Sequence, residues 1–266
     1  MLKSFIYLLF IFIFLGCGKY DIQNRIDLAN NIALKNNFIS KDINTDDFTI
    51  KTYIKNLNSS KNLKLYIEGD GFSWIDKHTI SPNPTPINPV SLNFAIKDTA
   101  SNVVYMARPC QYNFTNNCKS KYWTDSRFSN IIIKNINQAI DVLKKHMQID
   151  TIELIGFSGG GAIVTLISSR RDDIVKITTI AGNLNHKLLH QFHHLNYMED
   201  SLNPINIASN ISYIPQIHYI AEFDKIIPKS IVTSFIKASS QYNNIKIHTI
   251  KNATHSYGWK SLEGKL

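Results

Sequence analysis

The sequence predicts an α/β fold, in which a doubly wound, mostly parallel sheet is flanked by helices and carries no large cap domain. Strand-like runs alternate with helical patterns along the chain, and such alternation indicates parallel strands joined by crossover helices. One strand-like run, 151–157, passes through a glycine-rich turn directly into an apolar helical stretch. At 266 residues the chain can form one large core, and we expect a single domain over 17–266.

The elements are expected in a regular order. Helical patterns occupy 22–36 and 129–147, and strand-like runs occupy 48–54, 63–67, 102–107, 151–157, 176–181, 214–221 and 245–250. Four prolines over 81–89 exclude a helix or a central strand there and indicate an extended surface loop. Between Asn183 and Pro215, a short helical excursion that includes 188–197 is too small for a full lid. We therefore expect a fairly open site.

A G-x-S-x-G pattern stands at 156–160, between a strand and a helix. In this context it predicts a nucleophile elbow, a sharp turn that exposes the hydroxyl of Ser158. Gly156 and Gly160 leave room for the strand and the helix to approach each other. The amide of Gly159, at the start of the helix, is expected to point at a developing oxyanion. A glycine-rich loop that binds phosphate, or a plain turn, is the alternative.

An activated serine needs a base and a carboxylate that orients the base. In chain order they follow the serine, each on a loop after a strand. The loop after 214–221 contains Asp224, and the loop after 245–250 contains His255. We predict Asp224 as the acid and His255 as the base. Glu222 is the alternative acid, whereas His218 and His248 fall inside strand patterns, where a packed or edge role is expected.

A second oxyanion donor is expected from the loop after the strand at 63–67. This loop reads Glu-Gly-Asp-Gly-Phe over 68–72, and its glycines permit close approach to a bound acyl group. The amide of Gly71 or of Phe72 is the predicted donor. The alternative is an ordinary Asp-Gly turn.

These features resemble the α/β-hydrolases. The runs Leu-Tyr-Ile-Glu-Gly-Asp-Gly at 65–71 and Arg-Pro-Cys-Gln-Tyr at 108–112, with Tyr-Trp-Thr at 122–124 and Arg-Phe at 127–128, are similar to a group of bacterial α/β-hydrolases, many of them lipoproteins. The resemblance covers roughly residues 22–260. It implies the α/β-hydrolase fold and the Ser-Asp-His triad, and it implies no substrate.

The first sixteen residues have the pattern of an export signal. Lys3 precedes an apolar run over 5–15, which is shorter than the ~20 residues of a spanning helix. Gly16-Cys17 then resembles a bacterial lipobox, so we expect a lipoprotein signal peptide over 1–16 and lipidation of Cys17. Gly18 favours the outer membrane or the periplasmic face of the cell envelope. An ordinary secretory signal or an uncleaved anchor is the alternative.

Cys110 and Cys118 remain in the exported chain, in one loop after a strand. An oxidising compartment favours a disulfide between them, and two free thiols are the alternative. His186, His190, His193 and His194 crowd one region, but no cysteine or carboxylate cluster completes a metal site. We expect no metal and no cofactor.

The net charge of +9 is scattered, without a dense basic run, so nucleic-acid binding is not expected. The sequence therefore predicts an envelope serine hydrolase with a small-molecule or lipid-like acyl substrate and a carboxylic ester as the favoured bond. An acyltransferase or peptidase with the same triad, and a binding lipoprotein without catalysis, are the alternatives.

Overall fold

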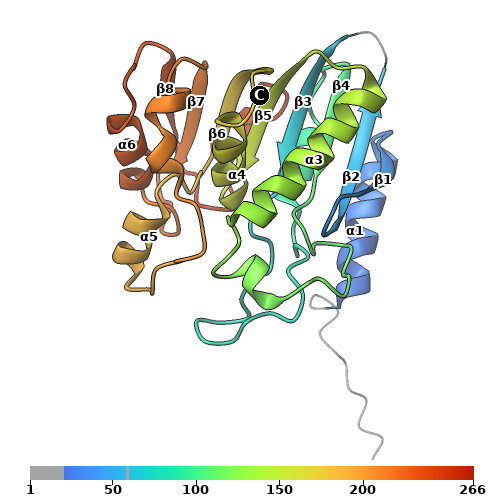
Figure 1. Ribbon diagram of the computed structural model, residues 1–266, viewed down its shortest axis with the longest axis horizontal. Coiled ribbons are helices and arrows are strands. Elements are labelled where there is room, and N and C mark those ends of the chain that lie inside the picture. Colours follow the sequence, from blue (N-terminus) through green and yellow to red (C-terminus); the bar gives the residue numbers. More distant parts are fainter. Residues whose placement is uncertain (1–20, 58–59) are drawn as a thin grey trace, which may run out of the picture.

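The computed structural model describes residues 21–57 and 60–266, and one sheet runs through this part of the chain (Figure 1). The strand order is β1-β2-β4-β3-β5-β6-β7-β8. The strands are β1 (Ile39–Asn44), β2 (Thr49–Asn56), β3 (Asn62–Ile67), β4 (Asn102–Met106), β5 (Thr151–Phe157), β6 (Ile174–Ile180), β7 (Gln216–Ala221) and β8 (Ile245–Ile250). β2 pairs antiparallel with β1 and β4, and the pairs from β4 to β8 are parallel. The predicted mostly parallel sheet is confirmed.

Helices cover both faces of this sheet. They are α1 (Ile22–Lys35), α2 (Val90–Ala95), α3 (Asn130–Met147), α4 (Gly159–Ser168), α5 (His186–His193) and α6 (Lys229–Lys237), with 3-10 turns at Ser120–Trp123, Pro204–Ile207, Ser209–Ile211 and Lys260–Leu262. α3, α4 and α6 pack on one face, around Leu65 and Ile132. α1, α2 and the C-terminal segment pack on the other, around Tyr66 and Leu92. The sheet is thus the middle layer of three.

The centre of the sheet is buried on both faces because β5 and α4 are almost wholly apolar. In β5 the residues from Leu154 to Phe157 are buried, and every residue of α4 is buried. Parallel strands covered by helices require this composition. β5 ends at Phe157 and α4 begins at Gly159, so a single residue, Ser158, makes the turn between them.

The proline-rich segment 81–89 differs from the prediction. It forms no helix or strand, as expected, but Ser81, Asn83, Pro84 and Thr85 are buried, so it is not a surface loop. The guanidinium of Arg25 on α1 donates hydrogen bonds to backbone carbonyls of this segment, at Asn83 and Thr85. These bonds satisfy carbonyls that a proline-rich chain cannot pair in a sheet.

The predicted signal segment 1–16 and Cys17 lie outside the described residues. Over 21–57 and 60–266, no helix has the length and apolar character needed to cross a membrane.

Candidate active site

Ser158 occupies a strained turn between β5 and α4. Its φ of 51° and ψ of −117° lie outside the regions that non-glycine residues prefer. A side chain at Gly156 would overlap the backbone of Gly160, and one at Gly160 would overlap the carbonyl of Ile67. Both glycines therefore let strand and helix meet at this turn, as the sequence predicts. The turn places the serine side chain at the carboxyl end of β5.

Three side chains from distant parts of the chain meet at this point. The hydroxyl of Ser158 lies 3.0 Å from Nε2 of His255, and Nδ1 of His255 lies 2.9 Å from Oδ2 of Asp224. The other carboxylate oxygen, Oδ1, accepts the backbone N–H groups of Ile226 and Ile227, each at 2.8 Å. The side chain of Asp224 is 1% exposed. A fixed carboxylate holds Nδ1 as the donor, which leaves Nε2 free to accept the serine proton.

The alternative acid and bases take other positions. Glu222 accepts the backbone N–H of Asn252 through Oε2 at 2.9 Å. His218 is fully buried and bonds the hydroxyl of Thr179 through Nδ1 at 2.8 Å, and burial lowers the pKa of His218 to about 4. His248 stacks on Tyr219. The structure therefore brings Asp224 and His255 to the serine, and it places the alternatives in packing or loop-forming roles.

The loop after β3 lies against the elbow. A Cβ on Gly69 would come within 3.5 Å of the Ser158 Cβ, so Gly69 is next to the nucleophile. Nε2 of Gln111 donates to the carbonyl of Gly69 at 3.0 Å. Because the N–H of a trans peptide points opposite to its carbonyl, the amide of Asp70 points away from Gln111. Apart from bonds within helices, the backbone N–H groups of Asp70 and Gly159 donate no hydrogen bond to another described residue.

The two donors predicted in this loop are placed differently. The N–H of Phe72 donates to the carbonyl of Pro84 at 3.0 Å, so this amide is already engaged and the Phe72 prediction is withdrawn. Gly71 has a φ of 69°, and the space beside its Cα is filled by Pro84 and Gln111. Gly71 therefore lies on the Gln111 side of the loop, and its role as a donor stays a prediction. The local sequence does not indicate the orientation of the Asp70 backbone amide, because this orientation depends on Gln111, which lies far along the chain.

An ion cluster lies over the start of α4. The carboxylate of Asp70 pairs with Nη1 of Arg108, and its Oδ2 lies 3.3 Å from Nε of Arg127. Burial alone would raise the pKa of Asp70, but the charges of Arg127 and Arg108 outweigh it and hold this pKa below its ordinary value. Both guanidinium groups also lie over the ring of Phe128, at 5.2 and 5.3 Å from its centre. Asp70 is therefore ionised beside Ser158.

A second buried carboxyl, Glu68, lies directly before this loop. Its Oε1 accepts the N–H of Gly69 at 2.8 Å and of Ser91 at 3.4 Å, whereas Oε2 has no hydrogen-bond partner among the described residues. Burial raises the pKa of Glu68 to about 7, although the hydrogen bonds to its oxygens act in the opposite direction. The bond to Gly69 makes Glu68 a support of the loop beside Ser158.

Cys110 and Cys118 form a disulfide, with Cα atoms 5.6 Å apart. The predicted pairing is thus present. The closed loop contains Gln111, whose side chain bonds the carbonyl of Gly69 and also accepts the N–H of Arg108 at 3.0 Å. The disulfide therefore stabilises the segment that orients the loop after β3.

Exposed apolar side chains border the three central residues. Phe223 and Ile226 flank Asp224, Tyr257 follows His255, and each is more than half exposed. The imidazole of His193, at the end of α5, bonds the carbonyl of Ile226, so α5 contacts this border of the site. No group of three or more His, Cys, Asp or Glu in the described segments is arranged to hold a metal ion.

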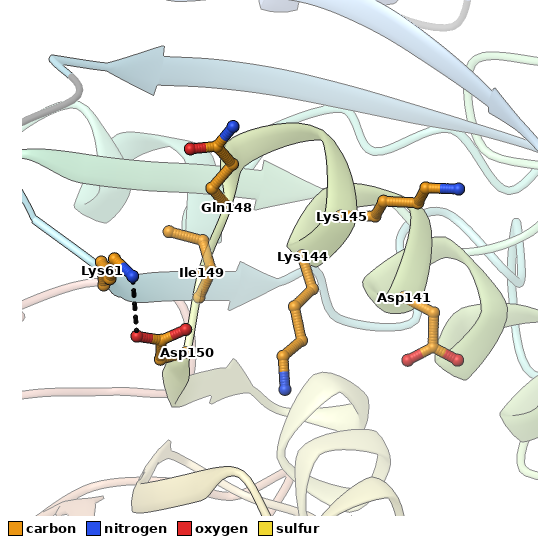
Figure 2. A pocket seen from close by; sticks show the side chains of 7 residues that line it. All are labelled: Lys61, Asp141, Lys144, Lys145, Gln148, Ile149 and Asp150. Carbon is orange, nitrogen blue, oxygen red and sulfur yellow. Dashed lines mark ion pairs between the residues drawn. The ribbon is translucent and has the colours of Figure 1, made fainter.

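A polar hollow of about 530 Å³ lies elsewhere on the molecule (Figure 2). Figure 2 shows Lys144 and Lys145 from the end of α3 beside the Lys61–Asp150 ion pair. Asp150 precedes β5, whereas Ser158 follows it. The hollow is therefore at the opposite end of the strand from the serine.

Comparison with solved structures supports the fold. An esterase from Pyrococcus furiosus, Pf2001, matches with a TM-score of 0.61 at 16% identity, over 86% of this chain and 88% of its own. Est1E from Butyrivibrio proteoclasticus matches with 0.58 at 15%, over 82% and 90%. XC6422 from Xanthomonas campestris, a serine hydrolase without a lid, matches with 0.56 at 11%, over 85% and 90%. The chain has the α/β-hydrolase fold. No family model matches it, and neither does a curated protein.

Proposed function

We propose that the protein is a serine hydrolase that cleaves a carboxylic ester through Ser158, His255 and Asp224. The observation that carries this proposal is the continuous hydrogen-bonded chain from the serine hydroxyl through the imidazole to the buried carboxylate. The strained turn at Ser158 and the esterases among proteins of the same fold also support it.

In the proposed first step, Nε2 of His255 takes the hydroxyl proton while Oγ of Ser158 attacks the carbonyl carbon. Negative charge develops on the carbonyl oxygen, and the amides of Gly159 and Asp70 are the proposed donors to it. His255 then protonates the leaving alcohol, and the acyl group stays on the serine. Asp224 keeps the imidazole in the required tautomer and stabilises its charged form.

In the second step, His255 removes a proton from water, and the resulting hydroxide attacks the acyl-enzyme. The tetrahedral intermediate collapses, the acid leaves, and Ser158 recovers its proton from His255. Transfer to another alcohol would follow the same path with that alcohol in place of water. Hydrolysis is favoured because the border of the site is exposed and accessible to water.

Kinetics with short-chain p-nitrophenyl esters test this function. Ser158→Ala and His255→Ala should each remove nearly all turnover, and the double variant should be scarcely worse, because triad members act as a unit. A folded Ser158→Ala protein with full esterase activity would show that the nucleophile lies elsewhere. A wild type inert to ester, thioester and peptide panels would favour a binding role.

We also propose that Cys17 carries a lipid anchor and that the enzyme acts at the cell envelope. The side chain of Ile22, at the start of α1, lines an apolar hollow together with Phe72 and Ile75 of the loop after β3. Ile22 lies five positions after Cys17, and an extended chain over five positions spans at most about 17 Å. An anchor at Cys17 would therefore hold the end of the molecule that carries the site near the membrane surface.

A further inference from the structure

A cluster of polar side chains beside the proposed nucleophile has no role in the steps described above, which use only the backbone amide of Asp70 from it. It consists of Asp70, Arg108, Arg127, His186 and His190, and we call it the arginine cluster. The ion pairs of Asp70 join the two arginines, and the ring of Phe128 contacts both guanidinium groups. The ring of His186 lies 6.1 Å from that of Phe128 and 6.2 Å from that of His190.

The arginine cluster borders the place where a substrate carbonyl would lie. A Cβ on Gly159 would overlap the carboxylate of Asp70 and would come within 3.0 Å of Nη1 of Arg108. Gly159 follows Ser158 directly, and a Cβ on Gly69, next to Asp70, would lie 3.5 Å from the Ser158 Cβ. A group attached close to the scissile bond can therefore reach this cluster.

Hydrogen-bond donors in the arginine cluster exceed the acceptors. Both Nη atoms of Arg108 are engaged, Nη1 with Asp70 and Nη2 with the carbonyl of Arg127. Arg127 donates through Nη1 to the carbonyl of Thr124 at 3.3 Å, its buried Nε faces Oδ2 of Asp70 at 3.3 Å, and its Nη2 has no hydrogen bond to any described residue. The side chain of Arg127 is 13% exposed, so Nη2 can meet a ligand.

One of the two histidines adds a further donor. His186 is 5% exposed, and its ring nitrogens lie near the backbone of Ser201 and Leu202 but form no hydrogen bond of acceptable geometry with a described residue. Nδ1 of His190 donates to the carbonyl of Asn196. Burial lowers the pKa of both rings, that of His186 to about 4, so each is neutral near pH 7; the single N–H of His190 is used by Asn196, and His186 keeps one N–H for a ligand. A buried imidazole without partners is costly unless a ligand supplies them.

Charge decides what kind of ligand fits. Two guanidinium groups face one carboxylate, so the arginine cluster has a net charge of +1 by this count. Guanidinium donors match the oxygens of carboxylates and phosphates. We propose that Arg127, with His186, binds an anionic group of the ester substrate, either a carboxylate or a phosphate. This inference rests on the proposed function and specifies its substrate class.

Matched p-nitrophenyl esters test the proposal on the full chain. The hydrogen glutarate ester carries a carboxylate, its methyl ester is a neutral isostere, a phosphonate analogue represents the phosphate arm, and the 5-aminopentanoate ester is cationic. The wild type should prefer at least one anionic ester over the neutral one by about 10- to 100-fold in kcat/KM, which is the range for a hydrogen bond to a charged group. The cationic ester should be the poorest.

Arg127→Gln should reduce that preference to near unity through KM of the anionic ester. Arg127→Lys should retain part of the preference, which distinguishes binding from a structural role. Arg170→Gln is the matched control, because Arg170 follows α4 and bonds Asn130. Its anionic preference should equal that of the wild type.

An equal rate for anionic and neutral esters, or a preference unchanged in Arg127→Gln, would overturn the inference and leave the proposed hydrolysis intact. If no ester is cleaved, the proposed function fails and equilibrium binding decides the inference. Glutarate or inorganic phosphate should then bind the wild type more tightly than Arg127→Gln. Equal binding by the two proteins would overturn it.

Discussion

Replacing Asp224 by asparagine changes one atom of the carboxylate that faces His255. Oδ1 of Asp224 accepts two backbone N–H groups, while Oδ2 accepts Nδ1–H of the imidazole. The asparagine oxygen can keep the two backbone bonds, so its NH₂ group must face Nδ1. Two donors cannot bond each other, so the imidazole shifts its proton to Nε2.

The shifted tautomer cannot work as a base. Nε2 then presents an N–H to Oγ of Ser158, 3.0 Å away, and has no lone pair for the serine proton. Loss of the orienting carboxylate lowers kcat by roughly 10³- to 10⁴-fold in other triads, and we expect a similar loss here. The fold should persist, because the two backbone bonds that shape the loop remain.

Steady-state kinetics with a short-chain p-nitrophenyl ester measure this effect. Glu222→Gln is the matched control, since Glu222 lies on the same loop and its carboxylate accepts the backbone N–H of Asn252. Its kcat should stay within about threefold of the wild type. Near-normal activity in Asp224→Asn, with collapse in Glu222→Gln, would refute the reasoning and transfer the role to Glu222.

Three further predictions concern stability and export. Burial raises the pKa of the Glu68 carboxyl from 4.5 to about 7 on folding. Ionisation of Glu68 therefore destabilises the fold as the pH rises through that window. Glu68→Gln should raise the free energy of unfolding by up to about 3 kcal/mol at pH 8 and by under about 1 kcal/mol at pH 5. Equal effects at both pH values in denaturant titrations would contradict this. Replacing Cys110 and Cys118 by alanine should lower the free energy of unfolding by about 2.5 kcal/mol, as expected for a loop of this size, and an unchanged midpoint would count against it. Metabolic labelling with a fatty-acid analogue should mark the wild type but not Cys17→Ser, and a labelled variant would disprove lipidation there.

The central elements could be predicted because their residues carry the signal locally. β5 and α4 are mainly apolar, and the glycine-rich turn at Ser158 joins them, so pattern and burial agree. The strand at Ile245–Ile250 also has the predicted bounds. Strong periodicity within one segment is what sequence reasoning detects best.

Elements with weak local patterns were not predicted. β1 is an edge strand with one buried residue, so its sequence shows little alternation. α6 contains the β-branched residues Ile231, Val232 and Thr233, which lower its helical propensity. It is a helix because Ile231, Val232 and Phe235 pack into the core.

Details of the site depended on contacts between distant segments. The amide of Phe72 is engaged by the carbonyl of Pro84, and the Asp70 peptide is oriented by the bond of Gln111, in the disulfide loop, to the carbonyl of Gly69. Neither contact can be predicted without the relative positions of the two segments. The contact of Asp224 with His255 joins two loops, and the sequence left Asp224 and Glu222 as alternatives for this carboxylate. Each depends on a hydrogen bond between loops that are far apart in the sequence, which no local pattern encodes.

The most direct test of the central claim is covalent labelling of the purified protein with a fluorophosphonate, mapped by peptide mass spectrometry. Such probes phosphonylate a serine only when a neighbouring base activates it. The account predicts one adduct, on Ser158, that is lost in His255→Ala although the serine is still present. No adduct on the folded wild type, or an adduct on another serine, would contradict it.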